Sequence, residues 1–302
     1  MSSSVNLINS LKNISKREKI AYIEIVFRFF AEEFLRRLSK TQFKDKLILR
    51  GGYLVNQLTD FEGITDKTLD FLYIDSDEKQ LDVNNIISNI ISADTKFNFC
   101  EFSAGSAEKM VGQTGYNGYR INITAKIGSI RLNFDVNIGI GDILFHQTEE
   151  LSIVSILSDD EKNEILSYPV ESVIAEKLDI ILKRFELNNC MKHMYDIVLL
   201  SKTFDFDGYE LQRAINATLK NRKNDCNANR LKEIGELSAD ADMLKQWQHF
   251  ALKNAIELKF NEVLNCMLWF LEPVYDSINH ESRWQKNWSG SNTEWDEPLY
   301  LY

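Results

Sequence analysis

The sequence predicts an α+β fold with a domain boundary near residue 150. Strand-like and helix-like patterns are interspersed in the first half of the chain, whereas helical spacing of apolar residues prevails from Pro169 onward. Only three prolines and thirteen glycines occur in 302 residues, which indicates long regular elements and few loops. We therefore expect a mixed domain of strands and helices over residues 1–150. A helical domain with an aromatic-rich tail is expected over residues 151–302.

The chain opens with two segments that we expect to be helical. Residues 1–19 are polar and predict a partly helical arm, and residues 20–38 carry apolar side chains at helical spacing. These apolar positions are Ile23, Val26, Phe27, Phe30, Phe34, Leu35 and Leu38. We interpret the aromatic run as core. Arg28, Arg36 and Arg37 are typical of a solvated helix face, with contact to phosphate or RNA as the alternative.

A paired glycine joins an apolar strand to a helix at the centre of the first half. Residues 47–49 are apolar, Gly51 and Gly52 follow, and residues 53–58 continue as a helix-like segment. Two glycines let the backbone approach a ligand closely, and the N–H groups that open a helix bind phosphate oxygens well. A tight turn without a ligand is the alternative interpretation.

The next extended run carries acidic residues on one face. Its alternation places Asp66, Thr68 and Asp70 on the same side of a strand that ends at Tyr73. Carboxylates in this position can hold the Mg²⁺ ion that a bound phosphate brings.

A second carboxylate belongs to a later strand. Residues 83–92 have helical spacing, residues 97–102 read as a strand, and two alternating strands follow at 119–125 and 129–138. In the last of these strands Asp135 lies on the polar face. We expect its carboxylate to be either solvated or a metal ligand.

The second half is predominantly helical. Pro169 suits the first turn of a helix, and Lys177 and Arg184, seven residues apart, lie close to one face of it. Another helix begins at residues 195–200, and a polar, basic loop is expected at residues 220–232.

The C-terminal tail, residues 284–302, contains three tryptophans. Tail aromatics commonly fasten a terminus to the body of a protein, and we favour that interpretation over stacking on bases.

Composition limits the classes of function. A net charge of −10 argues against a general nucleic-acid coat, because neutralisation of phosphates dominates nonspecific affinity. RNA binding stays possible if basic side chains share a face. The candidates are Arg28, Arg36, Arg37, Lys177, Lys183 and Arg184.

The compartment is expected to be the cytoplasm. No apolar run reaches membrane-spanning length, and the first residues lack the apolar stretch and cleavage site of a secretory signal. The four cysteines are far apart and match no zinc-binding spacing, which suits a reducing environment.

Five segments in order resemble the AbiEii-like abortive-infection nucleotidyltransferase toxins, a branch of the polymerase-beta-type nucleotidyltransferases associated with type IV toxin–antitoxin systems. The resemblance covers roughly residues 20–200. The segments are LRGGYL at 49–54, KTLDFLY at 67–73, YNGYRINI with RLNFDVNIGIGD between 116 and 142, YPVESVIAEKLDIILKR at 168–184, and YDIVLL at 195–200.

The resemblance implies a nucleotidyltransferase-type mixed sheet with helices, followed by a helical bundle. It also implies transfer of a nucleoside monophosphate from a nucleoside triphosphate to an RNA acceptor, with tRNA favoured, by an enzyme that uses two Mg²⁺ ions. A cognate antitoxin is the implied partner, and phage defence the implied setting. No membrane partner is expected.

The same resemblance assigns roles to residues of this chain. Arg50, Gly51 and Gly52 would contact the nucleotide, and Asp70 and Asp135 would be metal ligands. The helical half would contribute three further side chains, of which Lys177 and Asp196 would be catalytic and Lys177 would also neutralise triphosphate charge. The third is Arg184, expected to bind phosphate or acceptor RNA. The alternative is that Lys177 and Arg184 are ordinary helix charges and that Asp196 caps a helix.

One expected carboxylate is absent. The family's strand carries two acidic residues separated by one position, and the preferred register puts Thr68 at the first of them. The other register puts Leu72 at the second. Asp66 lies two residues before Thr68 and is a possible replacement ligand, about 7 Å further along the strand.

Three functional hypotheses follow from the sequence. The first is an active nucleotidyltransferase toxin, and the second is a nucleotide- or RNA-binding homologue that has lost catalysis with its missing carboxylate. The third is an interaction module in which the sheet only supports partner binding.

Overall fold

The computed structural model of the chain describes residues 2–64, 66–74, 81–111, 117–142, 144–145, 147–157, 163–184, 190–224 and 229–296. The chain folds into two compact units. The first comprises Met1–Asp60, Thr65–Asp142 and Thr148–Tyr168, and the second comprises Phe61–Ile64, Ile143–Gln147 and Pro169–Tyr302. The chain therefore leaves the first unit at Tyr168, and all residues from Pro169 onward belong to the second. The expected boundary near residue 150 lies within the first unit. The reason is that residues 149–167 add strands to the sheet of that unit.

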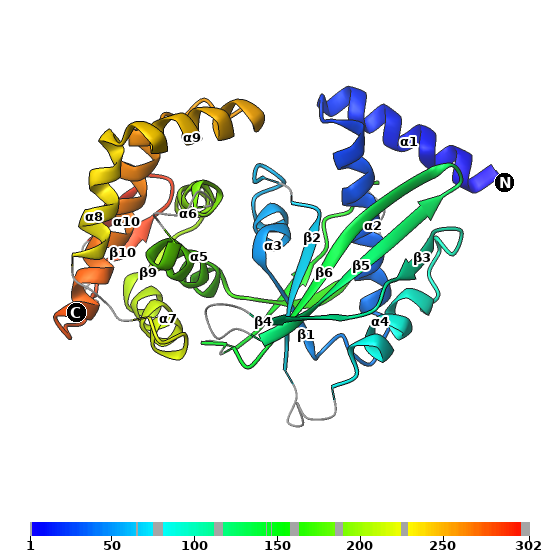
Figure 1. The fold of residues 1–302 in the computed structure, drawn as a ribbon, viewed down its shortest axis with the longest axis horizontal. Helices are drawn as coiled ribbons and strands as arrows, with labels where there is room; N and C mark the ends of the chain where they lie inside the picture. Colours follow the sequence, from blue (N-terminus) through cyan, green and yellow to red (C-terminus); the bar gives the residue numbers. More distant parts are fainter. Residues whose placement is uncertain are drawn as a thin grey trace, which may run out of the picture. The chain divides into compact units, whose positions relative to one another are not determined.

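The first unit combines a mixed sheet with helices (Figure 1). Its helices are α1 (Ser2–Glu18), α2 (Tyr22–Leu38), α3 (Gly51–Leu58) and α4 (Val83–Ser92). Its strands are β1 (Leu47–Arg50), β2 (Thr68–Tyr73), β3 (Glu101–Ala104), β4 (Glu108–Val111), β5 (Asn117–Ile127), β6 (Ile130–Ile140), β7 (Glu149–Ser152) and β8 (Glu164–Ser167).

The sheet has the order β3-β5-β6-β2-β1-β8-β7, and β4 pairs with β5. Its centre is parallel where β2 meets β6, and β1 also runs parallel to β8. The remaining pairs are antiparallel, including the long β5–β6 pair that is visible in Figure 1. A mixed sheet with a helical C-terminal region confirms the predicted fold class.

Aromatic side chains of α2 form the core against the sheet. Phe27 packs edge-on against Phe134 and Tyr53, with ring centroids 5.9 and 6.0 Å apart, and Phe34 meets Phe134 at 6.1 Å. Edge-to-face pairs at this separation are favourable beyond the area they bury. The predicted core role of the aromatic run is confirmed, but Ile23, at the start of the same stripe, is 44% exposed.

The arginines near the end of α2 are buried, so the expectation of a solvated or RNA-facing role for them is wrong. Arg36 Nη1 donates to Glu33 at 2.8 Å, and Arg37 Nε donates to the same carboxylate at 2.9 Å. The two guanidinium groups also lie over the rings of Phe97 and Phe102, at 5.0 and 4.7 Å from the centroids. A glutamate within one helical turn compensates charges that the sequence alone places at the surface.

Two other local differences have plain causes. Residues 97–100 form a turn, and the predicted strand begins only at Glu101. Side chains hold this turn, because Thr95 Oγ1 accepts from the Phe97 N–H and Asn98 Oδ1 accepts from the Thr95 N–H. The strands β7 and β8, which we did not predict from the sequence, lie between β6 and Tyr168.

The second unit is mostly helical. Its helices are α5 (Val170–Arg184), α6 (Met191–Thr203), α7 (Gly208–Asn221), α8 (Arg230–Glu236), the short 3-10 helix η2 (Leu237–Ala239), α9 (Ala241–Lys253) and α10 (Phe260–Asn279). A small antiparallel sheet joins β9 (Phe206–Asp207), β10 (Asn287–Ser289) and β11 (Glu294–Asp296) in the order β11-β10-β9. Among the described residues, no helix has the length and apolar composition needed to cross a bilayer.

The tail is fastened to this unit through tryptophan. Trp288 is 3% exposed, its ring centroid lies 4.8 Å from that of Phe270, and its indole N–H donates to the Ser201 carbonyl at 2.6 Å. Trp295 stacks on Phe270 at 5.8 Å with nearly parallel planes. These contacts confirm the interpretation of tail aromatics as fasteners, and residues 297–302 lie outside the described part of the chain.

Glu32 is a buried carboxyl group with an unusual pKa. It is 1% exposed, and the N–H of Ile156 donates to both of its oxygens, at 3.0 and 2.9 Å. Burial raises the pKa of Glu32 from 4.5 to about 8, against the lowering effects of the Ile156 hydrogen bond and of Arg28 and Arg36. The folded protein therefore keeps a proton on Glu32 at pH values where the unfolded chain releases it.

We expect this carboxyl group to make the protein less stable as the pH rises from about 4.5 to about 8. Its contribution is complete below the lower value and is lost above the upper one. The free energy of unfolding should fall by up to ~1.4 kcal/mol per pH unit from this group. Urea unfolding across the window should show a flatter profile for Glu32→Gln, whereas Glu24→Gln, at an exposed position of the same helix, should behave as wild type. An equally steep profile for Glu32→Gln would assign the dependence to another group.

Candidate active site

The acidic residues predicted as metal ligands lie on adjacent strands. β2 runs parallel to β6, with Thr68 opposite Asp135 and Asp70 opposite Asn137. Residues that face each other across a strand pair project to the same side of the sheet, and so do positions 68 and 70 of one strand. All four side chains therefore share one face. The Cα atoms of Asp70 and Asp135 are about 8 Å apart by strand spacing and rise.

Amide side chains orient both carboxylates. Asn137 Nδ2 donates to Asp70 Oδ1 at 2.8 Å, and Thr68 Oγ1 donates to Asp70 Oδ2 at 3.3 Å. On the other side, Asn122 Nδ2 donates to Asp135 Oδ1 at 2.9 Å. Each acid is thus held by a neutral donor from a neighbouring strand, which restricts its rotamers.

Arg120 extends the polar face onto β5. Its Nε donates to Asn137 Oδ1 at 3.0 Å and lies 4.0 Å from Asp135 Oδ2. The Arg120 side chain is half exposed, which leaves its charge accessible. The sequence placed Asn137 on this face without a role and did not single out Arg120 or Asn122. Strand alternation could have identified them, but only the register shows which acid each one meets.

The predicted glycine turn lies against one of these carboxylates. Gly51 has a φ of +74°, and a Cβ atom built there would be 2.6 Å from Asp70 Oδ2. A side chain at this position would be strained and would displace the acid. The backbone that opens α3 therefore lies directly beside Asp70.

The N-terminus of α3 is suited to an anion. Arg50 is the N-cap residue and makes no side-chain capping hydrogen bond. The first N–H groups of a helix need acceptors from outside it, and a phosphate can supply them. The glycine turn and the acids therefore lie side by side within the first unit.

Arg50, which we predicted to contact the nucleotide, is held inside the first unit. It is 8% exposed, its Nη1 is 3.0 Å from Asp142 Oδ2, and it also donates to the Tyr168 hydroxyl at 3.3 Å. Asp142 thus compensates its charge. In this arrangement Arg50 joins the end of β1 to the residues that follow β6 and β8.

Asp66 lies outside β2, at an exposed position. Within the described residues, no three side chains of His, Cys, Asp or Glu come together as a potential metal site. Thr68, which stands at the first acidic position in the preferred register, lies opposite Asp135 and two residues before Asp70. Leu72, which stands at the second acidic position in the other register, is fully buried opposite Gly139.

The predicted residues of the helical half form a buried ion pair in the second unit. Lys177 Nζ on α5 lies 2.5 Å from Asp196 Oδ2 on α6, and both side chains are almost fully buried. The other oxygen, Asp196 Oδ1, has no hydrogen-bond partner among the described residues. Arg184 is the last residue of α5, and its side chain lies outside the described part.

The hydroxyl group of Tyr195, beside this pair, has a raised pKa. Burial, together with the carboxylates of Glu62 and Asp196, raises the pKa of Tyr195. Tyr195 therefore stays protonated at neutral pH and can act as a hydrogen-bond donor.

We expect removal of one member of the Lys177–Asp196 pair to destabilise the protein more than removal of both. Lys177→Met should cost about 3–5 kcal/mol of unfolding free energy, because it leaves a buried carboxylate uncompensated. The double variant Lys177→Met/Asp196→Leu should be less destabilised than the two single effects added together. Chemical denaturation measures all three, with Lys202→Met, an exposed change on α6, as the control. Additive losses would show that the pair is not coupled.

A second expectation concerns the glycine turn. Gly51→Ala should lower the free energy of unfolding by about 1–2 kcal/mol, because an alanine there needs a left-handed backbone and collides with Asp70. Gly105→Ala is the matched control, since its Cβ would lie 3.6 Å from the nearest atom, the Asn122 carbonyl oxygen. Thermal unfolding compares the two. Equal, small effects would mean that the turn tolerates a side chain.

A family model and two solved structures are similar to this chain. A family model described as the nucleotidyl transferase AbiEii toxin of the type IV toxin–antitoxin system matches residues 33–265. Two crystal structures from Helicobacter pylori are similar at 12% identity each. One, a candidate nucleotidyltransferase, covers 84% of this chain and 95% of its own length with a TM-score of 0.47. The other, JHP933, covers 83% and 92% with a TM-score of 0.44. The search of curated proteins finds no match. Since the family model spans most of the chain, this protein belongs to the AbiEii family of nucleotidyltransferase toxins.

Proposed function

We propose that this protein is a Mg²⁺-dependent nucleotidyltransferase toxin that moves a nucleoside monophosphate from a nucleoside triphosphate to tRNA. The observation that carries the proposal is the position of Asp70, beside Asp135 on the neighbouring strand and against the backbone of Gly51. Phosphoryl-transfer enzymes depend mainly on charge and position, which this arrangement supplies.

The triphosphate would bind at the start of α3. The N–H groups of Gly51 and Gly52 are there, and Gly51 lacks the side chain that would hold a phosphate away from the acids. Asp70 is then close to any phosphate that this turn binds. Arg50 supports the site through its bond to Asp142 and keeps the turn in place.

The acids fit Mg²⁺ by their chemistry. This ion is commonly held by one or two carboxylates together with substrate phosphates and water, and Asp70 and Asp135 offer hard oxygen ligands on one face. When bound, the ion neutralises triphosphate charge and favours ionisation of the attacking hydroxyl. Asn137 and Asn122 would fix the two carboxylates in position. Asp66 is a further possible ligand from the segment before β2.

For three residues of the helical unit, Lys177, Asp196 and Arg184, we propose the roles that the family resemblance implies. An ammonium group has three donors, and Asp196 occupies one of them, so Lys177 retains donors for a phosphate oxygen. Asp196 would orient the lysine. Arg184 is proposed as a second phosphate or RNA contact. The family further implies a cognate antitoxin, and we propose that the toxin acts on cytoplasmic tRNA in abortive infection.

A specific observation favours a second candidate, a catalytically disabled homologue that still binds nucleotide or RNA. Thr68, which faces Asp135 and bonds to Asp70, is a neutral hydroxyl at the position where the family resemblance leads us to expect a carboxylate. A hydroxyl is a weaker ligand for Mg²⁺ than a charged oxygen. Two-ion chemistry at this site would then lack one of its acids.

The proposal is tested by incubating the protein with total tRNA, Mg²⁺ and each labelled nucleoside triphosphate in turn. We expect label in the RNA band, lost with EDTA, and a loss of at least about 100-fold in rate for Asp135→Asn, because a metal ligand contributes several kcal/mol. Asp242→Asn, at an exposed site on α9, is the control and should retain the wild-type rate.

The same experiment separates the two candidates. Absence of label with every nucleotide would overturn the active-enzyme proposal. Thr68→Asp would then be assayed under identical conditions, and recovered transfer would establish the disabled homologue. If wild type is active, an unchanged rate for Thr68→Asp would show that the hydroxyl position is not limiting.

A further inference from the structure

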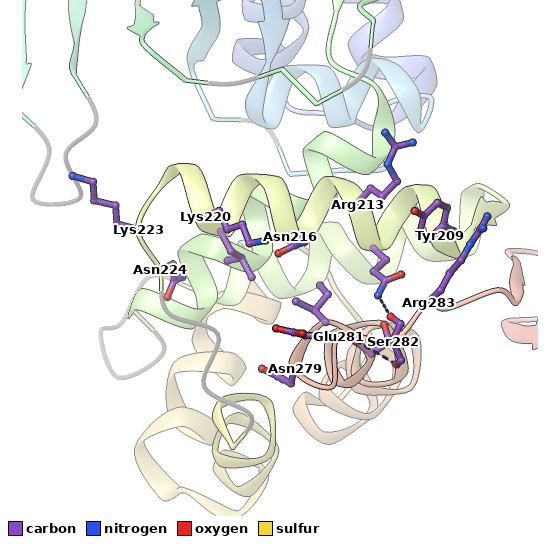
Figure 2. A pocket seen from close by; sticks show the side chains of 14 residues that line it. Tyr209, Arg213, Asn216, Lys220, Lys223, Asn224, Asn279, Glu281, Ser282 and Arg283 are labelled. Carbon is purple, nitrogen blue, oxygen red and sulfur yellow. Dashed lines mark hydrogen bonds between the residues drawn. The ribbon is translucent and has the colours of Figure 1, made fainter.

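The second unit contains a polar groove that lies apart from the Lys177–Asp196 pair. It runs between α7 and the C-terminal end of α10, encloses a cavity of about 830 Å³, and is shown in Figure 2. This volume lies within the ~300–1,000 Å³ range of ligand pockets. The charged residues among its described lining are Arg213, Lys220, Lys223, Glu281 and Arg283.

The walls of the groove are fastened to each other. Gln212 of α7 is 8% exposed, its side-chain amide donates to the Ser282 carbonyl at 2.5 Å, and its oxygen accepts from the Trp284 N–H at 3.1 Å. The Gly208 N–H also donates to the Lys286 carbonyl at 3.1 Å. The segment after α10 is therefore held against α7. These hydrogen bonds fix the two walls of the groove relative to each other.

Positive charge dominates this groove although the chain as a whole is acidic. Arg213, Lys220, Lys223 and Arg283 line it, and Glu281 is the one carboxylate among the described lining residues. The whole chain carries a net charge of −10. This local excess of cations creates a favourable potential for a polyanion.

Most of these cations are available to a ligand. Lys220, Lys223 and Arg283 are exposed, and none of them forms an ion pair with a carboxylate in the described part of the chain. Arg213 is partly compensated by Glu210 at 3.0 Å. Arg213 and Lys220 are seven residues apart on α7, about 10 Å by helical rise, and Lys223 follows the helix end. This row is long enough to follow more than one phosphate of a strand, since phosphates repeat every ~3.4 Å along a duplex axis.

The end of the groove offers flat surfaces for bases. The Arg283 guanidinium lies 3.8 Å from the Tyr209 ring centroid, and Figure 2 shows the two side chains next to each other. Tyrosine rings and guanidinium planes both stack on unpaired bases. The amides of Asn216, Asn224 and Asn279 also line the groove, and those of Asn224 and Asn279 already donate to Asp179 Oδ1 and to the Tyr275 carbonyl. Stacking planes and amides beside a row of cations fit a nucleic acid better than an acidic protein surface.

We propose that this groove binds the sugar–phosphate backbone of the acceptor RNA, with Lys220 and Lys223 on phosphates and Tyr209 with Arg283 against a base. The inference rests on the proposed function, in that the acceptor is RNA. The groove takes the place of the basic surface that we expected from the sequence. Three candidates for that surface, Arg36, Arg37 and Lys177, are buried in ion pairs. RNA binding would thus have its own site in the helical unit.

The test measures tRNA binding as a function of salt for Lys220→Gln/Lys223→Gln. The matched control is Lys245→Gln/Lys253→Gln, which removes two exposed cations from α9. The groove variant should bind tRNA at least tenfold more weakly at low salt, and the slope of log K against log salt should be smaller by about one per lysine lost. The control should match wild type. A groove variant that binds tRNA with wild-type affinity and slope overturns the proposal.

A second variant tests the stacking part. Tyr209→Leu should weaken tRNA binding by about fivefold or more while leaving the salt slope unchanged, because it removes a ring and no charge. Thermal unfolding checks that the variant is folded. Wild-type affinity in folded Tyr209→Leu would remove the base-stacking role.

The outcome is separable from that of the proposed transfer reaction. Suppose that wild type binds tRNA in a salt-dependent way, that the groove variant loses this binding, and that wild type transfers no label. The groove proposal would then stand, and the proposed activity would be refuted. Transfer by wild type with equal tRNA binding in both variants would refute the groove and sustain the activity. Binding of an acidic peptide through the same lysines, with no binding of tRNA, would overturn the RNA assignment.

Discussion

The parallel pairing of β2 with β6 is the constraint on which the candidate active site depends. It sets Thr68 opposite Asp135 and Asp70 opposite Asn137, and so brings acids from distant parts of the chain onto one face. A slip of one residue would turn each of these side chains to the other face, because the period of a strand is two. The hydrogen bond from Asn137 to Asp70 exists only in this register, and the one from Asn122 to Asp135 depends in the same way on the pairing of β5 with β6. The close approach of Gly51 to Asp70 adds a second condition, since it requires a residue without a side chain at the start of α3.

Aromatic packing in the interior of the first unit stabilises this register. Phe27 and Phe34 of α2 pack against Phe134, which belongs to β6, one residue before Asp135. The inner face of the strand is thus anchored in an aromatic cluster while its outer face carries the acid. The buried Glu33, Arg36 and Arg37 of α2 form ion pairs, and Arg37 lies over Phe102, whose ring contacts those of Phe34 and Phe134. A buried pair of this kind adds little net stability, but breaking it would be costly.

Charge is distributed in a way that the composition conceals. The helical unit holds one cation, Lys177, in a buried pair with Asp196 and gathers others along the groove beside α7. A buried lysine is suited to a defined role near a carboxylate, whereas exposed lysines in a row are suited to a backbone of phosphates. Membership of a nucleotidyltransferase toxin family gives both arrangements a functional setting. An acidic protein can bind RNA in this way, because only the potential at the groove matters at contact.

Much of the fold was predictable because its signals are local. Periodicity located α2, α4, β5 and β6, and the glycine pair with its flanking apolar runs located β1 and α3. The strand at 97–102 was misplaced, since Thr95 and Asn98 bind the backbone and hold a turn.

The candidate site was predictable in part, as residue types and as faces of strands. The sequence by itself determined the family, the α+β class and the acids on their polar strand faces, because these follow from ordered motifs and from a period of two or of 3.6 residues. Only the tertiary structure decided that Asn137 meets Asp70, that Arg36 and Arg37 are buried, and that Tyr209 and Arg283 meet across a basic groove. Each of these joins residues through strand register or helix packing, which no local pattern encodes.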